Sequence, residues 1–407
     1  MGDDRKIYFD HQASTPVDPR VFEAMIPYFQ ERFGNPSSHI HTEGVRANQA
    51  LDAARGQVAE LVNSETDEII FTSCATESNN LGLRGFLKAN PDKGRHIIIS
   101  EIEHYSILNQ ALKLKDEGYE VSTLKVAEGG LIDPEAVENA IREDTALISV
   151  NLANSEIGTI QPIKEIAEIA EKHGVFFHAD GAIAVGNIPI DVKELGIDAL
   201  TISAHNFYGP KGIGALYLRG GNNISPIFEG GFQEYGMRSG TENVPGIVGL
   251  GVAAELASIE MPKRIEHLQK LGKMLWKGLE EEIEYINFTG HPIQRLPGHI
   301  SFWIRYIEGE SLLLMLNIKG VMAASGSACS SNLKGADEED LAASHVLTAI
   351  GVPAEFCSGS LTVSMGKDNT EEEVRYLLDI MPEVVEKLLM MSPLYADKLR
   401  GKDPYSK

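Results

Sequence analysis

The sequence has few cysteines, little positive charge and no apolar run that reads as long enough to cross a bilayer. Its three cysteines are too few for a disulfide framework in a chain of 407 residues, so free thiols are expected. It has 36 basic and 59 acidic side chains, and the net charge of −23 argues against a general nucleic-acid surface. Because residues 1–5 also lack the basic and apolar regions of a signal peptide, we expect a cytoplasmic protein without membrane contact.

Apolar runs alternate with amphipathic helical stretches through the first half of the chain, and 43% of all residues are hydrophobic. The strand-like runs lie at residues 69–71, 97–99, 121–124, 147–150, 175–177 and 200–202. Such alternation predicts an α/β fold in which helices cover both faces of a mainly parallel sheet. Ligands of such sheets bind at the carboxyl ends of the strands.

A long charged helical stretch near residues 255–285 predicts a domain boundary. We expect a large α/β domain over residues 17–255. Residues 1–16 and 256–395 are expected to form a smaller α/β domain, and residues 396–407 a flexible tail.

One stretch, residues 201–219, organises the chain. A buried strand leads into the polar turn Ser203-Ala-His-Asn206, and Gly209-Pro-Lys-Gly212 separates this turn from a second apolar run. The polar turn therefore follows a strand directly, where a site is expected.

This stretch resembles the cofactor-lysine segment of the cysteine desulfurases, whose pattern is Ser-x-His-Lys followed by Gly-Pro-x-Gly-x-Gly. The resemblance spans residues 6–395 and implies the aspartate aminotransferase-like fold of the class V pyridoxal phosphate (PLP) enzymes, with a seven-stranded type of sheet. Where the family has the lysine that binds PLP as an imine, this sequence has Asn206. The lone pair of a carboxamide nitrogen is delocalised into the carbonyl group, so covalently bound PLP is predicted to be absent.

The resemblance places the phosphate of PLP at one end of the site. Residues 71–80 read as a strand, a tight turn and the start of a helix, which is an arrangement that favours an anion. The family's phosphate-binding positions are matched here by Ala75, Thr76, Ser203 and His205, and by Thr241 reaching over from the neighbouring subunit. The alternative for Thr76 is that it only caps a helix.

The ring and substrate end of the site departs from the family. His104 matches the imidazole that stacks on the pyridine ring, and Asp180 matches the carboxylate that pairs with the pyridine nitrogen. However, Ser155 replaces an asparagine, Ile183 a glutamine, and Thr362 the arginine that binds the substrate carboxylate. With Asn206, these changes predict impaired PLP catalysis. The alternative is an active desulfurase or lyase that holds PLP non-covalently.

The sulfur-handling motif is kept. The stretch Ser325-Gly-Ser-Ala-Cys329-Ser-Ser331 resembles the family's catalytic-cysteine motif, and residues 325–342 match its mobile loop. In the family this thiolate becomes a persulfide and passes sulfur to scaffold proteins. Small neighbouring residues leave the Cys329 thiol exposed for such chemistry, whereas Cys357 beside Phe356 reads as a buried thiol.

The chain resembles a branch of the family, found in archaea and anaerobes, that lacks the lysine and keeps the loop cysteine. This resemblance implies a homodimer that works with an IscU-like iron–sulfur scaffold protein. Cys329 would then accept sulfide, or lend a thiolate to an iron–sulfur cluster. A purely structural docking dimer is a further alternative.

A separate hypothesis concerns Cys74, which replaces a glycine of the family's phosphate-binding turn. The same pocket is expected to contain His104, His205 and Asp180, which are side chains that bind metals. Cys74 is therefore either part of a metal site or a residue that fills space.

Overall fold

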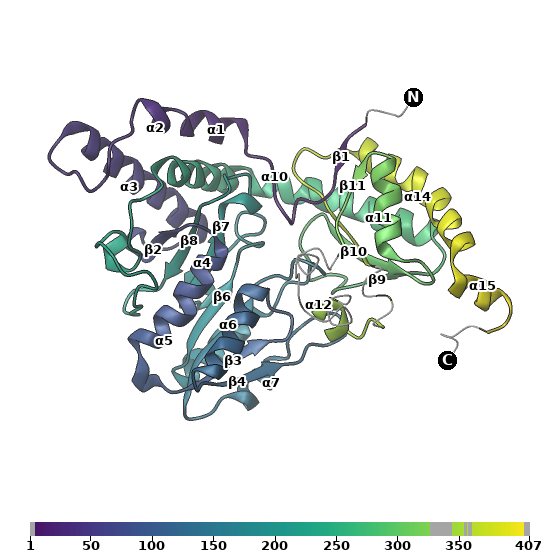
Figure 1. The fold of residues 1–407 in the computed structure, drawn as a ribbon, viewed down its shortest axis with the longest axis horizontal. Coiled ribbons are helices and arrows are strands. Elements are labelled where there is room, and N and C mark those ends of the chain that lie inside the picture. The colour runs from purple at the N-terminus through teal and green to yellow at the C-terminus, as the bar shows by residue number, and fades with distance from the viewer. Residues whose placement is uncertain (1–4, 326–343, 354–355, 357–359, 403–407) are drawn as a thin grey trace.

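The computed structural model describes residues 5–325, 344–353, 356 and 360–402. Two packed parts are joined by one long helix, α10 (Val244–Glu282), as Figure 1 shows. The larger part contains a seven-stranded sheet, and the smaller part contains a three-stranded sheet and a two-stranded sheet.

The large sheet confirms the predicted α/β fold. Its strands are, in spatial order, β2 (Ile69–Thr72), β8 (Gly214–Leu218), β7 (Ala199–Ser203), β6 (Phe176–Asp180), β5 (Thr145–Asn151), β3 (His96–Ser100) and β4 (Glu120–Leu124). Strand β8 is antiparallel to both of its neighbours, and the other pairs are parallel. The carboxyl ends of β3, β5, β6 and β7 therefore lie at one edge.

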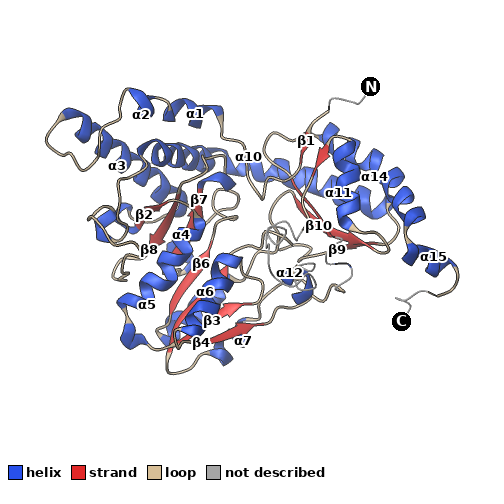
Figure 2. Cartoon of the chain, in the orientation of Figure 1, coloured by secondary structure: helices blue, strands red, loops and turns tan. Residues whose placement is uncertain are grey.

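Alternate residues of the central strands enter two different cores, because successive side chains of a strand point to opposite faces. In β3, Ile98 joins one core, and Ile97 and Ile99 join the other. Helices α3 (Thr42–Val62), α7 (Pro134–Ala140), α8 (Ile163–His173) and the first half of α10 cover the first face. The helical stretch formed by α4 (Ala75–Asn80), a π-helical turn and α5 (Phe86–Ala89) covers the second face, together with α6 (Tyr105–Asp116) (Figure 2).

Helix α10 belongs to both parts of the molecule. Its residues up to Met261 pack in the large core, and Leu268, Leu271, Leu275 and Leu279 pack in the core of the smaller part. The helix also corrects one statement from the sequence, because an 18-residue window of it, with a mean hydropathy of 1.4, is long and apolar enough to cross a membrane. In the structure 61% of this window is buried, as expected for a core helix.

The smaller part brings the N-terminal strand back to the C-terminal half of the chain. Strand β10 (His299–Ile304) lies between β9 (Ile286–Phe288) and β12 (Ser360–Ser364), and β1 (Ile7–Tyr8) pairs with β11 (Val321–Met322). Helices α11 (Gly309–Ile318) and α14 (Glu371–Met391) complete this part. The other α-helices in the described part of the chain are α1 (Pro19–Met25), α2 (Pro27–Gln30), α9 (Val192–Leu195), α12 (His345–Ala349) and α15 (Pro393–Leu399). Helix α15 extends into the range expected to be a tail.

Candidate functional site

A cavity of about 360 Å³ lies at the carboxyl ends of the parallel strands, as the fold predicts. Segments that follow β3, β5, β6 and β7 line it together with the turn between β2 and α4. Asp10 and Gln12, near the N-terminus, also line it, as do Ala324 and His345 from the C-terminal half of the chain. The cavity is thus enclosed by segments far apart in the sequence.

The predicted anion-binding end is assembled in this cavity. Ala75, Thr76, Ser203 and His205 all line it. The hydroxyl oxygen of Ser203 and Nδ1 of His205 are buried, and within the described residues neither has a hydrogen-bond partner. Burial, and then the charge of Lys211, lower the pKa of His205, which favours the neutral imidazole. Two buried polar atoms without partners fit a ligand such as a phosphate, which offers them acceptor oxygens.

Thr76 does not cap the helix. The residue before α4 is Cys74, and its side chain makes no capping hydrogen bond. The side chain of Thr76 is exposed, so the phosphate-binding interpretation stays open for it. Thr241 is also exposed and does not line the cavity of its own chain.

Ion pairs hold the turn between β2 and α4. Glu77 accepts a hydrogen bond from the backbone N–H of Ser73 at 2.7 Å and another from Nε of Arg238 at 2.8 Å. Behind the turn, the buried guanidinium of Arg55 makes two hydrogen bonds of 2.7 Å to the carboxylate of Glu234. These contacts stabilise the turn that forms one side of the anion-binding end.

His104 and Asp180, the two residues expected beside the pyridine ring, both line the cavity. Asp180 accepts hydrogen bonds from Asn79 Nδ2 at 2.8 Å and from the backbone N–H of Ala182 at 3.0 Å. His104 is the N-cap of α6, and its Nδ1 accepts from the backbone N–H of Ser106 at 3.1 Å. Both side chains are thus held in place at the cavity wall, where the sequence predicts the pyridine ring.

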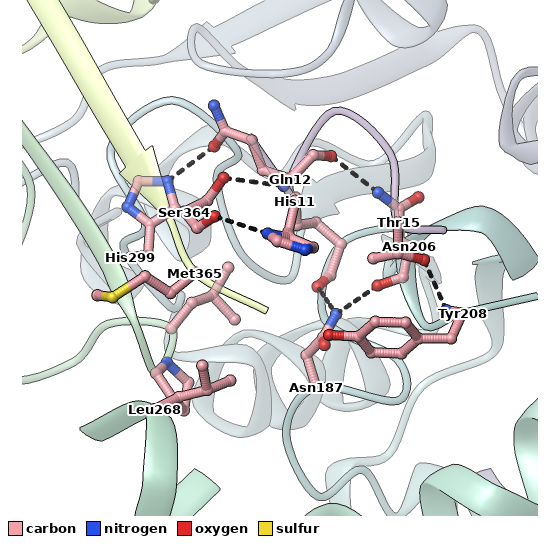
Figure 3. Close-up of a pocket in the computed structure, with 13 residues that line it drawn as sticks. His11, Gln12, Thr15, Asn187, Asn206, Tyr208, Leu268, His299, Ser364 and Met365 are labelled. Carbon is pink, nitrogen blue, oxygen red and sulfur yellow. Dashed lines mark hydrogen bonds between the residues drawn. The ribbon is translucent and has the colours of Figure 1, made fainter. Parts of the chain in front are cut away.

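Asn206 lies at the cavity wall, and only 7% of it is exposed. Its Nδ2 donates a hydrogen bond of 2.9 Å to the backbone oxygen of Gln12, as Figure 3 shows. A second cavity of about 50 Å³ lies behind it and shares Gln12, Ile183 and Asn206 with the first. The nearby Lys211, which also carries a primary amine, lines neither cavity. Its Nζ donates to the backbone oxygen of Thr15 at 3.5 Å.

The other substituted positions separate into two groups. Ser155 and Ile183 line the cavity, as expected. Thr362 does not, although it was expected on the same face of the pocket; its hydroxyl donates to the backbone oxygen of Glu156 at 3.2 Å. Thr362, in β12, is 1% exposed and pairs with Ala324.

Three further carboxyl groups line the cavity, those of Asp10, Glu103 and Glu156, and the sequence motifs predicted no role for them. Burial is the main reason that the pKa of Glu103 rises to about 8, that of Glu156 to about 7 and that of Asp10 to about 6. Among the described residues no arginine or lysine lines the cavity to offset them. The sequence could have pointed to two of these carboxyl groups as site residues, because Glu103 directly precedes His104 and Glu156 directly follows Ser155.

Of the three cysteines, Cys74 lies within the described residues. Cys329 and Cys357 lie outside the described residues, although Ser325, at the start of the motif around Cys329, lines the cavity. Cys74 lines the cavity and accepts a weak hydrogen bond from the Ser73 hydroxyl at 3.7 Å. Over the described ranges no three histidine, cysteine or acidic side chains are grouped to hold a metal ion, so the metal hypothesis for Cys74 gains no support.

The fold and the position of this cavity define a protein of the PLP-dependent transferase type. The model of the aminotransferase class-V family matches residues 7–377, and the chain belongs to this family.

Its relatives within the family are named as cysteine desulfurases. The chain is 49% identical to cysteine desulfurase IscS of Methanosarcina thermophila over 398 residues, which cover 98% of this chain and 96% of the relative. It is 47% identical to cysteine desulfurase IscS 1 of Archaeoglobus fulgidus, over 95% of this chain and 99% of that relative. Among solved structures, a NifS-like protein matches with a TM-score of 0.87 and 36% identity, over 94% of this chain and 100% of its own.

Proposed function

We propose that this protein transfers sulfur or assembles iron–sulfur clusters, with Cys329 as the persulfide carrier or as a thiolate ligand of a cluster. We further propose that it does not remove sulfur from cysteine through an imine of PLP. The names of its relatives support the sulfur chemistry in general. The residues around the cavity support the second, finer statement.

The observation that carries the proposal is the carboxamide of Asn206. Bound PLP supplies an electron sink for breaking bonds of an amino acid, and the family uses it through a lysine imine. At this position the nitrogen of Asn206 donates to the backbone oxygen of Gln12, and no described lysine lines the cavity. The described residues thus offer no primary amine at the place where an imine would form.

The surroundings of an amino-acid substrate give independent support. A substrate carboxylate needs a cationic partner in a buried site, and an arginine fork supplies it best. Here the hydroxyl of Thr362 donates its hydrogen bond to the backbone oxygen of Glu156. Asp10 and Glu156 line the cavity. A carboxylate would therefore meet acidic groups, so binding of cysteine is expected to be weak.

The proposed working form is a cytoplasmic homodimer that meets an IscU-like iron–sulfur scaffold protein. Thr241 is exposed, which leaves it accessible to a neighbouring subunit. Ser325 lines the cavity, so the segment that carries Cys329 begins beside the proposed site.

A second candidate function is supported by the anion-binding end. The unpartnered atoms of Ser203 and His205 fit the phosphate of PLP, and Asp180 fits its pyridine nitrogen. The protein would then be a lyase that uses PLP without covalent attachment.

The two candidates are separated by adding PLP and cysteine to the purified protein. We expect no adduct after borohydride reduction and no release of sulfide, whereas Asn206→Lys should gain the adduct. Transfer of sulfur from an inorganic polysulfide to a scaffold protein should be lost in Cys329→Ser and kept in Asn206→Ala, because the thiolate takes up a sulfane sulfur as a persulfide while the shortened polysulfide leaves. A yellow wild-type protein that releases sulfide from cysteine at enzymatic rates would overturn the proposal, and an unimpaired Cys329→Ser variant would favour a docking role alone.

A further inference from the structure

The cavity has unsatisfied hydrogen-bonding groups of two opposite kinds. The first kind binds anions: Ser203 is 0% exposed, and its hydroxyl oxygen and Nδ1 of His205 have no partner among the described residues. Buried polar atoms of this kind are rare unless a ligand or water completes them. A phosphate monoester supplies several acceptor oxygens and a negative charge.

The second kind binds cations. Glu103 is 0% exposed, and its Oε2 is buried without a partner, while Oε1 accepts hydrogen bonds from Asn151. Oδ1 of Asp10 is likewise buried without a partner, and both residues line the cavity. Since no arginine or lysine lines the cavity in the described part of the chain, these acids lack a cation.

The expected ligand therefore carries a phosphate and also a positively charged hydrogen-bond donor. The volume of about 360 Å³ lies near the lower end of the range for small-molecule pockets, about 300 to 1,000 Å³, so a single substituted ring with one phosphate fits it. Asp180 and His104 line the same cavity, and a carboxylate and an imidazole suit a ring with a basic nitrogen, such as a pyridine.

We propose that the cavity binds pyridoxamine 5′-phosphate, the amine form of the cofactor, non-covalently and in preference to the aldehyde and alcohol forms. The primary ammonium group would supply the donor and the charge that Asp10 and Glu103 lack. Neither the aldehyde nor the alcohol carries a positive charge for these acids. This inference rests on the proposed function in one respect, namely that Asn206 forms no imine.

Pyridoxine 5′-phosphate is the matched control ligand, because it differs from the amine form only in a hydroxyl group in place of the ammonium group. Calorimetry on the full-length protein, freed of bound cofactor, should show the amine form binding about tenfold more tightly or better, since charge-assisted hydrogen bonds are about twice as strong as neutral ones. Because burial raises the pKa of Glu103 to about 8, binding of the amine form should also release protons. Titrations in buffers of different ionisation enthalpy measure this release.

Variants separate the two ends of the cavity. Asp10→Asn and Glu103→Gln should reduce the preference for the amine form with little effect on the alcohol form, and Ser203→Ala should weaken both alike. Glu128→Gln, at an exposed carboxylate outside the cavity, is the control. Circular dichroism checks that each variant folds.

Three outcomes would overturn the inference. The first is equal affinity for the amine and alcohol forms, and the second is an unchanged preference in both acid variants. The third is no binding of any of the three forms at millimolar concentration, which would leave the proposed function intact. A borohydride-trapped adduct of wild-type protein with the aldehyde would instead overturn the proposed function, so the two failures are distinguishable.

Discussion

The hydroxyl of Ser344 donates a hydrogen bond to the carboxylate of Glu156. The backbone oxygen of Glu156 also accepts from Thr362, which exchanges backbone hydrogen bonds of 2.8 and 3.1 Å with Ala324. Ala324 and Ser344 lie on either side of residues 326–343, the segment that contains Cys329. One residue at the cavity therefore connects to both flanks of the proposed sulfur-carrying segment, through its side chain to one flank and through its backbone to the other.

Replacing Glu156 by alanine should loosen the second flank. The buried Ser344 hydroxyl would lose its acceptor, and a loss of this kind costs about 1–3 kcal/mol. We expect a lower free energy of unfolding in urea and faster amide hydrogen exchange in α12, which begins after Ser344. Glu156→Gln keeps an acceptor oxygen and should stay close to wild type. Unchanged exchange in the alanine variant would contradict this role.

The same residue should make stability depend on pH. Burial raises the pKa of Glu156 from 4.5 to about 7, so the folded protein binds a proton that the unfolded chain has already lost. Its contribution to stability is thus present below pH 4.5 and is lost as the pH rises through 7. Urea denaturation between pH 5 and 8 should show a shallower decline in Glu156→Gln than in wild type. Parallel curves for the two proteins would show that this carboxyl does not titrate as described.

The β2 region should be sensitive to the loss of either partner of the Arg55–Glu234 pair. Both side chains are buried, and Glu234 also accepts from the backbone N–H of Phe71 at 2.7 Å. Removing one partner leaves a buried charge, which costs about 3–5 kcal/mol. We expect this loss for Arg55→Met and for Glu234→Gln alone.

A double-mutant cycle provides the control for that pair. The double variant Arg55→Met with Glu234→Gln should be less destabilised than the sum of the two single variants, because neither charge is left alone. Additive losses would show that the two side chains act independently.

The sheet and much of the site follow from local sequence signals. Runs such as Ile97 to Ile99 are continuous and β-branched, which is typical of strands buried on both faces. Parallel strands place the residues after them at one edge, and this brings His104, Asp180, Ser203 and His205 to one cavity. The sequence therefore predicted best those site residues that lie at the end of a strand or shortly after it.

Other features depend on packing between distant segments and have no local signal. The pairing of Thr362 with Glu156 joins residues 206 positions apart, so the sequence pattern could not show that Thr362 lies outside the cavity. The early start of α10 was missed for a different reason. Gly251 lies in this early part of the helix, and a Cβ there would lie 2.6 Å from Cα of Ala54, so the glycine permits α3 and α10 to approach closely, which only the packed structure shows.

His178 provides a test of the core beneath the cavity. It is 0% exposed, and its ring nitrogens contact the hydroxyl groups of Ser149 at 2.9 Å and Thr201 at 3.0 Å. Burial lowers its pKa from 6.5 to about 4, so the unfolded chain binds a proton before the folded protein does. The resulting stability is present above pH 6.5 and is lost as the pH falls toward 4.

We therefore expect His178 to make a contribution opposite in sign to that of Glu156, so the difference in free energy of unfolding between wild type and His178→Gln should shrink as the pH falls from 6.5 to 4. This variant should be less stable than wild type at neutral pH because the glutamine cannot reproduce both ring contacts with the same shape. His39→Gln, at an exposed histidine, is the matched control and should follow the wild-type curve. Burial also lowers the pKa of His299 to about 4, so this histidine makes a contribution of the same sign that should persist in His178→Gln. If His178→Gln reproduces the full wild-type slope, the proton uptake that drives acid unfolding occurs elsewhere in the chain.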